Sequence, residues 1–234
     1  MIAKKNFDIS KIDPEIGEAI LIDKDINKTS FSAVYKVKKI LNLKKAGHAG
    51  SLDPKATGLL IICFGKHTKN ISMYQNLKKT YIGKFCLGKI SNTYDLEGEI
   101  RDGGDISGIN FNDLLDAKAL FEGEILQKPP MFSAAKKDGK ALYKYARKGI
   151  EVEREAKKVS IYRFDILKYE PPYVAFEIEC SKGVYIRSIA HDFGEKLGCG
   201  AYLHELRRIK IGDYSVDDAF KINELKQIAI SKNA

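Results

Sequence analysis

One carboxylate stands out as a candidate for catalysis. Asp53 lies in residues 46–60, a segment that three glycines interrupt at Gly47, Gly50 and Gly58. Glycine lets a backbone approach a ligand closely and adopt φ values that other residues avoid. Because Asp53 precedes a proline, its backbone is biased away from helix toward an extended or turn conformation. A lone Asp-Pro is an ordinary turn start, but a carboxylate on such a loop beside a rigid strand is also where catalytic groups tend to lie.

Two regular elements are expected to position this loop. Thr29 or Ser30 is a good N-cap, and the apolar residues behind it recur at helical spacing, which predicts a helix over residues 30–43. The uninterrupted apolar run 59–64 is typical of a buried strand. Catalytic groups are often found on loops that a rigid strand or helix supports.

The rest of the chain predicts an α+β fold with a mainly antiparallel sheet, because strand patterns follow one another with helices interspersed. Residues 91–108 read as a loop, and residues 170–172 as the turn of an antiparallel hairpin. No G-x-G-x-x-G or P-loop is present. The other strands are expected at 18–22, 81–87, 159–169, 173–180 and 202–211, and the other helices at 69–75, 112–121, 186–197 and 222–230.

Composition limits the class of protein. The chain has 234 residues, of which 44% are hydrophobic and 30% charged, as in a folded globular protein. Its polar N-terminus lacks the apolar core of a signal peptide, and no apolar run is long enough to span a membrane. The four cysteines form no C-x-x-C pair, and no metal-ligand spacing links the histidines. We therefore expect a cytoplasmic protein that holds no metal.

Positive charge is concentrated in one segment. The formal net charge is +9, and residues 128–158 contain ten Lys or Arg against four Asp or Glu. This pattern fits a nucleic-acid binder, although a solvated basic face is an equally ordinary explanation. The segment 129–155 starts with Pro-Pro and interrupts the strand pattern, so it is interpreted as an insertion that reaches over a ligand.

Five segments together resemble the TruB family of pseudouridine synthases, in the family's order and over about residues 18–212. The Asp53 loop resembles the catalytic signature, and residues 23–30 resemble the N-terminal D-K-P-x-G-x-T-S motif. Residues 79–88 resemble the strand with the active-site tyrosine, and residues 129–147 the insertion that grips RNA. Residues 183–188, followed by 206–208, resemble the basic side of the active site.

The resemblance implies a pseudouridine synthase fold, with helices flanking the central sheet, and an isomerase that acts on the uridine at position 55 in the T loop of tRNA. In this reaction the glycosidic bond of uracil breaks, the base turns, and C5 becomes bonded to the ribose. No metal or cofactor is implied, and the expected partner is the tRNA T stem-loop, with no membrane and no obligate protein partner. The target base must be extruded from the folded RNA.

The resemblance also implies roles for single residues. Asp53 is the expected nucleophile, and whether it attacks the base or the ribose stays open. Arg187 is expected to pair with Asp53 and keep it ionised, Tyr81 to stack on the pyrimidine, and His48 to hold the flipped nucleotide. The residues expected to bind RNA or to brace the site are His48, Lys24, Thr57, Lys136, Tyr143, Arg147, Tyr185, Leu206 and Arg207.

The chain departs from the family pattern in a few places. Asp25 and Asn27 stand where proline and glycine are usual, and Phe132 stands where tyrosine is common. Only 22 residues follow Gly212. We therefore expect a single catalytic domain over residues 1–234, without the small PUA-type RNA-binding domain that often follows.

Three other functions compete with this interpretation. A guide-dependent synthase shares the Asp loop but usually carries the PUA domain. A binding protein that only helps tRNA to fold would not need Asp53. A carboxylate hydrolase would normally need a second acid close by.

Overall fold

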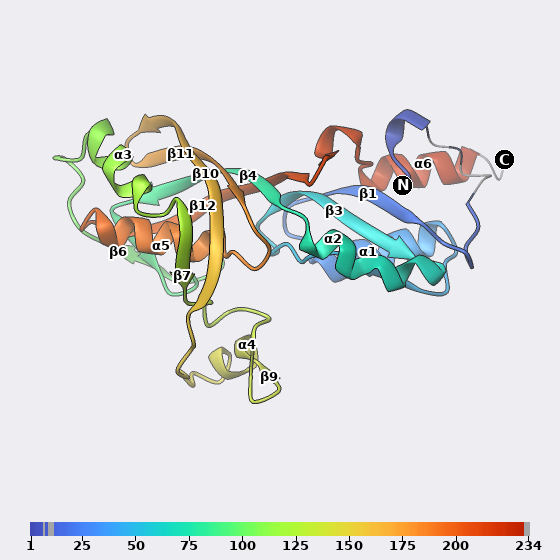
Figure 1. The fold of residues 1–234 in the computed structure, drawn as a ribbon, viewed down its shortest axis with the longest axis horizontal. Coiled ribbons are helices and arrows are strands. Elements are labelled where there is room, and N and C mark those ends of the chain that lie inside the picture. Colours follow the sequence, from blue (N-terminus) through green and yellow to red (C-terminus); the bar gives the residue numbers. More distant parts are fainter. Residues whose placement is uncertain (7, 9–11, 232–234) are drawn as a thin grey trace. The chain divides into compact units, whose positions relative to one another are not determined.

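The chain forms two compact units. The computed structural model describes residues 1–6, 8 and 12–231. One unit, here the terminal unit, comprises Met1–Tyr81 and Leu206–Ala234, and the other, the inserted unit, comprises Ile82–Glu205. The strands β4 (Lys79–Leu87) and β12 (Ala201–Ile211) contribute residues to both units (Figure 1).

The terminal unit is built around β3 (Thr57–Phe64), which is buried along nearly all its length. β3 pairs antiparallel with β1 and β2, and parallel with β12 through Thr57–Arg207 and Gly58–Arg208. The other elements of this unit are the 3-10 helices Lys4–Asn6, Gly65–Asn70 and Val216–Asp218, the strands β1 (Ala19–Lys24), β2 (Ala46–His48) and β13 (Tyr214–Ser215), and the helices α1 (Ser30–Ile40), α2 (Ile71–Asn76) and α6 (Ile222–Ser231).

Alternation along β3 divides the core of the terminal unit between two faces. Leu60 and Ile62 pack with the buried side chains of α1 and α6. Leu59 and Ile61 face the opposite way and pack with Tyr74 of α2. Because successive side chains of a strand point to opposite faces, a continuous apolar run is required when both faces are covered.

In the inserted unit, β11 lies between β4 and β10, and β7 pairs with the other side of β10. β10 is antiparallel to both β11 and β7. The other elements of this unit are β5 (Lys89–Ser91), β6 (Ile100–Asp102), β7 (Gly123–Gln127), β8 (Lys136–Lys137), β9 (Lys140–Ala141), β10 (Lys157–Glu170) and β11 (Tyr173–Cys180), and the helices α3 (Phe111–Ala119), α4 (Leu142–Ala146) and α5 (Ile186–Lys196).

Phenylalanines fill the core of the inserted unit. Phe85 of β4 stacks on Phe176 of β11 at 4.2 Å between ring centroids. Phe164 of β10 makes edge-on contacts with both rings at 6.2 and 6.4 Å, and Phe193 of α5 makes tilted contacts with Phe85 at 5.5 Å and with Phe164 at 5.9 Å. Aromatic pairs in such geometries contribute beyond their buried area, so this cluster fixes α5 on the sheet.

The structure confirms the α+β class, with helices flanking a mainly antiparallel sheet. It also adds elements to segments that were expected to be loops. Residues 46–48 form β2, and residues 100–102 form β6, which pairs with β5. The edge strand β7 was not predicted, because all but its last residue are at least partly exposed and show no apolar alternation. Across the described residues, no helix has both the length and the apolar character needed to cross a membrane.

The close approach of β3 and β12 depends on glycine at position 58. A Cβ there would lie 2.2 Å from the carbonyl oxygen of Arg208, and Gly58 has a φ of +104°. We expect Gly58→Ala to lower the free energy of unfolding by about 2 kcal/mol or more. Urea unfolding of both the variant and Gly108→Ala provides the test, because a Cβ at Gly108 meets nothing within 4 Å. Equal stability of the two variants would contradict the expectation.

Candidate active site

The Asp53 loop is a tight turn in the terminal unit. The Ala56 N–H donates to the carbonyl of Asp53 at 3.1 Å, and Gly50 adopts a φ of +111°. Leu52 and Ala56 are buried, whereas Asp53 is half-buried. The backbone of the loop is therefore anchored on both sides of a carboxylate that solvent still reaches.

Ser30, at the start of α1, fixes one side of this loop. Its Oγ accepts a hydrogen bond from the N–H of Leu52 at 2.8 Å and donates to the carbonyl of Leu52 at 3.1 Å. Ser30 is 3% exposed, so both bonds are shielded from water. The N-cap of α1 is Thr29, whose side chain accepts from the N–H of Ser32.

Lys24 ties the Asp53 loop to the loop that follows β1. Its Nζ donates to the carbonyls of Lys28 at 2.6 Å, Asp25 at 3.0 Å and Pro54 at 3.4 Å. Lys24 is 1% exposed. This geometry supports a role for Lys24 in bracing the two loops, and a contact of Lys24 with RNA stays a prediction.

Asn27, one of the departures from the family pattern, fits the same loop. It adopts a φ of +58°, in the left-handed region that asparagine tolerates better than most residues do. Its N–H donates to the carbonyl of Pro54 at 2.8 Å, and its Oδ1 accepts from Lys55 at 3.0 Å. Asparagine therefore replaces the usual glycine without loss of the turn.

Arg208 is the main support of the Asp53 loop, and it was absent from the predicted site residues. Its guanidinium is buried and donates to the carbonyls of Leu59 at 2.7 Å, Gly50 at 3.1 Å and Ser51 at 3.4 Å. Strand alternation could have indicated it. Arg207 and Arg208 are neighbours on β12, so their side chains must point to opposite faces of the sheet.

Arg207 lies against a carboxylate rather than free at the surface. Its two terminal nitrogens bind Asp23 at 3.0 and 2.8 Å, and Lys221 Nζ lies 3.0 Å from the same carboxylate. Burial would raise the pKa of Asp23, but the hydrogen bonds from Arg207 and Lys221 outweigh it and lower that pKa overall. A bidentate pair of this kind is directional and positions the end of β12.

Three other predicted residues of the terminal unit have clear positions. The Thr57 Oγ1 lies 3.5 Å from the carbonyl of Leu206, a long contact at the β3–β12 pairing. Tyr81 is buried in β4. His48 ends β2, and its Nδ1 has no hydrogen-bond partner among the described residues. Burial, and secondarily the charge of Arg208, lower the pKa of His48, which favours the neutral form of its ring.

Arg187, at the start of α5, has a carboxylate partner within the inserted unit. Its Nε lies 3.4 Å from Asp95 Oδ2, and its terminal nitrogens donate to the carbonyls of Thr93 at 3.1 Å and Phe132 at 3.0 Å. Arg187 is 4% exposed. Asp95 was missed by sequence analysis. The predicted pair of Arg187 with Asp53 involves both units and stays a prediction.

Gln127, at the end of β7, positions the residue that precedes α5. Its Oε1 accepts from the Tyr185 N–H at 2.8 Å, and its Nε2 donates to the Tyr185 carbonyl at 3.1 Å. The Ser188 Oγ donates to the Lys128 carbonyl at 3.1 Å nearby. The buried Gln127 side chain thus satisfies both backbone groups of Tyr185, as a residue on a neighbouring strand would, and it fixes the position of Tyr185.

The insertion (residues 129–155) leaves the sheet of the inserted unit at the ends of β7 and β10 (Figure 1). It contains the β8–β9 hairpin and α4. Lys136 is exposed on this hairpin, and the Arg147 guanidinium lies 5.3 Å from the ring of Tyr143. Basic groups beside aromatic rings suit contact with both the phosphates and the bases of RNA.

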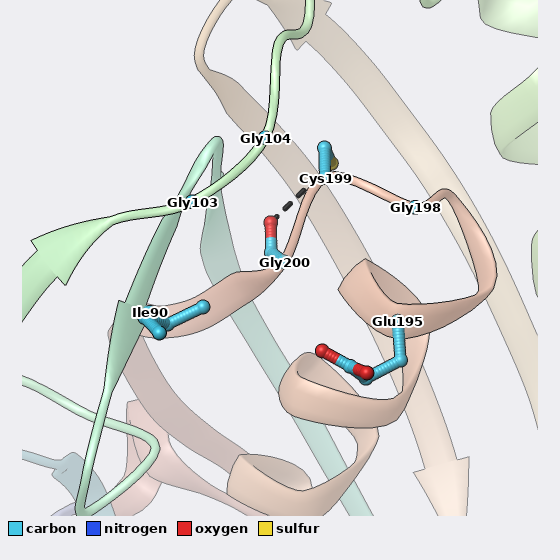
Figure 2. A pocket seen from close by; sticks show the side chains of 7 residues that line it. All are labelled: Ile90, Gly103, Gly104, Glu195, Gly198, Cys199 and Gly200. Carbon is cyan, nitrogen blue, oxygen red and sulfur yellow. Dashed lines mark hydrogen bonds between the residues drawn. The ribbon is translucent and has the colours of Figure 1, made fainter.

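A pocket of about 200 Å³ opens elsewhere in the inserted unit (Figure 2). Glycine backbone lines it, together with the side chains of Ile90, Glu195 and Cys199. None of the predicted site residues lines this pocket. The Gly104 N–H in its wall already donates to the Cys199 carbonyl, so this donor is used within the protein. The Asp53 loop, rather than this pocket, is the candidate active site.

Comparison with known proteins identifies the family. The family model for the N-terminal domain of TruB family pseudouridylate synthases matches residues 38–186, and that for the C-terminal domain of tRNA pseudouridylate synthase B matches residues 187–234. The chain is 46% identical to tRNA pseudouridine synthase B of Clostridium tetani over 208 residues, which are 89% of this chain and 72% of that protein. Against the Flavobacterium johnsoniae protein of the same name, identity is 47% over 213 residues, covering 88% and 93%.

A solved structure agrees with the sequence comparisons. The chain in the crystal structure of a Cbf5-Nop10-Gar1 complex superposes with a TM-score of 0.73 at 29% identity. The match covers 97% of the present chain and 58% of that one. This chain belongs to the TruB family of pseudouridine synthases. It is an isomerase of the tRNA-modifying class, which converts uridine to pseudouridine.

The lowered pKa of Asp23 predicts a pH-dependent stability. A carboxyl group whose pKa is lower in the folded than in the unfolded state adds stability above the unfolded value of about 3.9, and this is lost as pH falls through the folded value. Asp23→Asn should therefore cost about 2 kcal/mol at pH 7 and much less near pH 2. Urea unfolding at both pH values measures this, with exposed Asp116→Asn as the control. A penalty independent of pH would contradict the ion-pair explanation.

Proposed function

We propose that this enzyme isomerises the uridine at position 55 in the T loop of tRNA, with Asp53 as its nucleophile. The observation that carries the proposal is the way in which the Asp53 loop is held. Ser30, Lys24 and Arg208 fix its backbone at Leu52, Pro54 and Gly50, and Asp53 itself remains half-buried. Nucleophilic catalysis needs such a preorganised group beside a position that substrate can reach.

The reaction is balanced without an external oxidant or reductant. The bond between N1 of uracil and C1′ of the ribose breaks, the base turns, and C5 forms a bond to C1′. C5 then loses its proton, and N1 gains one. The Asp53 carboxylate would hold the detached base or ribose covalently in between, and both variants of this step are compatible with the proposal.

The remaining site residues take supporting roles in the proposal. Arg187 pairs with the Asp53 carboxylate, and Thr57 braces the loop. Tyr81 stacks on the uracil, a contact worth about 1–3 kcal/mol. His48, whose neutral form is favoured by the lowered pKa, hydrogen-bonds the flipped nucleotide.

Flipping a base out of a folded RNA costs stacking energy, which contacts elsewhere must offset. In this proposal the enzyme contacts the T stem-loop of the tRNA through Lys136, Tyr143 and Arg147 of the insertion. Tyr185, Leu206 and Arg207 make further contacts with the same RNA. In this proposal both units act as one catalytic domain over residues 1–234, in the cytoplasm, with tRNA as the partner and no obligate protein subunit.

Asp53→Asn should abolish turnover while RNA affinity stays within a few-fold of wild type. The amide has the same shape but is a far poorer nucleophile. Pseudouridine mapping on an unmodified tRNA transcript measures the product, and titration with the same transcript measures affinity. Normal turnover in the variant would remove Asp53 from the mechanism. Pseudouridine at another position in the wild-type reaction would overturn the assigned target.

Arg187→Met should lower the single-turnover rate at saturating RNA by orders of magnitude, because the proposed partner of Asp53 is lost. The variant also removes the ion-pair partner of Asp95, so Asp95→Asn is the matched control for disruption of the inserted unit. We expect Asp95→Asn to lower the rate much less than Arg187→Met does. If the two variants lose equal rate, Arg187 only positions Asp95 and its loop.

A further inference from the structure

The outer side of α1 carries a concentration of positive charge that the proposed site does not use. Residues 26–52 contain six lysines and no aspartate or glutamate. Lys28, Lys36, Lys38 and Lys39 form no ion pair with any residue that the structure describes. Such a stretch produces a positive potential that favours an anionic polymer.

Two aromatic side chains lie among these lysines. Phe31 is 75% exposed and Tyr35 is 56% exposed, whereas Ala33, Val34 and Val37 of the same helix are buried. At 3.6 residues per turn, positions 31, 35, 38 and 39 fall within about a third of the helix circumference. We call Phe31, Tyr35, Lys38 and Lys39 the α1 outer face.

The α1 outer face begins beside the Asp53 loop. Ser30, the first residue of α1, exchanges hydrogen bonds with Leu52, and Asn27 bonds to Pro54. With a rise of 1.5 Å per residue, the face extends for about 12 Å from Phe31 to Lys39. A strand that passes the Asp53 loop could therefore continue along α1 for about two nucleotides.

The combination of groups selects one kind of partner. Exposed aromatic rings stack on unpaired bases, and lysines between them neutralise phosphates. Lys39 Nζ already lies 5.9 Å from the ring centroid of Tyr35, so a phosphate and a stacked base could be bound side by side.

We propose that the α1 outer face binds the RNA strand next to the target uridine, with its bases on Phe31 and Tyr35 and its phosphates on Lys38 and Lys39. This inference rests on the proposed function, because it assigns a second contact for the same RNA. It adds a surface in the terminal unit to the contacts expected from the insertion.

Binding titrations with unmodified tRNA transcript at several salt concentrations test the proposal. Lys38→Ala with Lys39→Ala should weaken binding and flatten the slope of log Kd against log salt by about 1.4–1.8, as expected for two lost phosphate contacts. Phe31→Ala with Tyr35→Ala should weaken binding about fivefold or more and leave the slope unchanged. Lys69→Ala with Lys226→Ala removes the same charge from exposed positions of the same unit and should keep the wild-type slope.

All variants are measured in the Asp53→Asn background, so the outcome does not depend on turnover. Wild-type affinity and slope in both α1 variants would overturn the proposal, whatever Asp53 does. An equal change in the Lys69 and Lys226 control would also overturn it, because the effect would then come from net charge alone. If Asp53→Asn alone retains turnover while the α1 variants lose affinity, the proposed mechanism fails and the RNA surface stands. Thermal unfolding of each variant confirms that it is folded.

Discussion

The buried guanidinium of Arg208 is the interaction on which the Asp53 loop depends. It joins the carbonyls of Gly50 and Ser51 to that of Leu59, so one side chain links the loop to the strand that follows it. The arrangement is possible because Gly58 has no side chain where β12 passes β3. If the guanidinium were lost, the buried Leu59 carbonyl and the less buried carbonyls of Gly50 and Ser51 would each lose a hydrogen-bond donor.

Two neighbouring arginines on β12 bind different kinds of partner. Arg208 faces inward and is satisfied by neutral carbonyls, whereas Arg207 faces the other way and pairs with the carboxylate of Asp23. The same distinction separates Lys24 from the lysines of α1, since Lys24 is 1% exposed and serves the fold. Formal charge alone therefore says little about which basic groups are available to RNA.

Sequence patterns predicted elements that bury a continuous face and missed those that do not. The run 59–64 and the helical spacing after Ser30 became β3 and α1, whereas the exposed β7 and the three-residue β2 gave no apolar signal. The motif around Asp53 indicated the site, but its supports were not evident. Arg208 and Gly50 are 158 residues apart, and Gln127 and Tyr185 are 58 apart. Spacing along the chain does not predict which distant carbonyl will accept a hydrogen bond from a given donor.

The order of the chain has a consequence for synthesis. Asp53 and its loop leave the ribosome early, but Arg208 follows only after the whole inserted unit, Ile82–Glu205, has been made. Domains generally fold as units while synthesis proceeds at about 5–20 residues per second. The inserted unit can therefore fold first, while the Asp53 loop waits roughly ten to thirty seconds for its main support. A nascent chain would thus be unable to complete the hydrogen bonds of the Asp53 loop until Arg208 has been made.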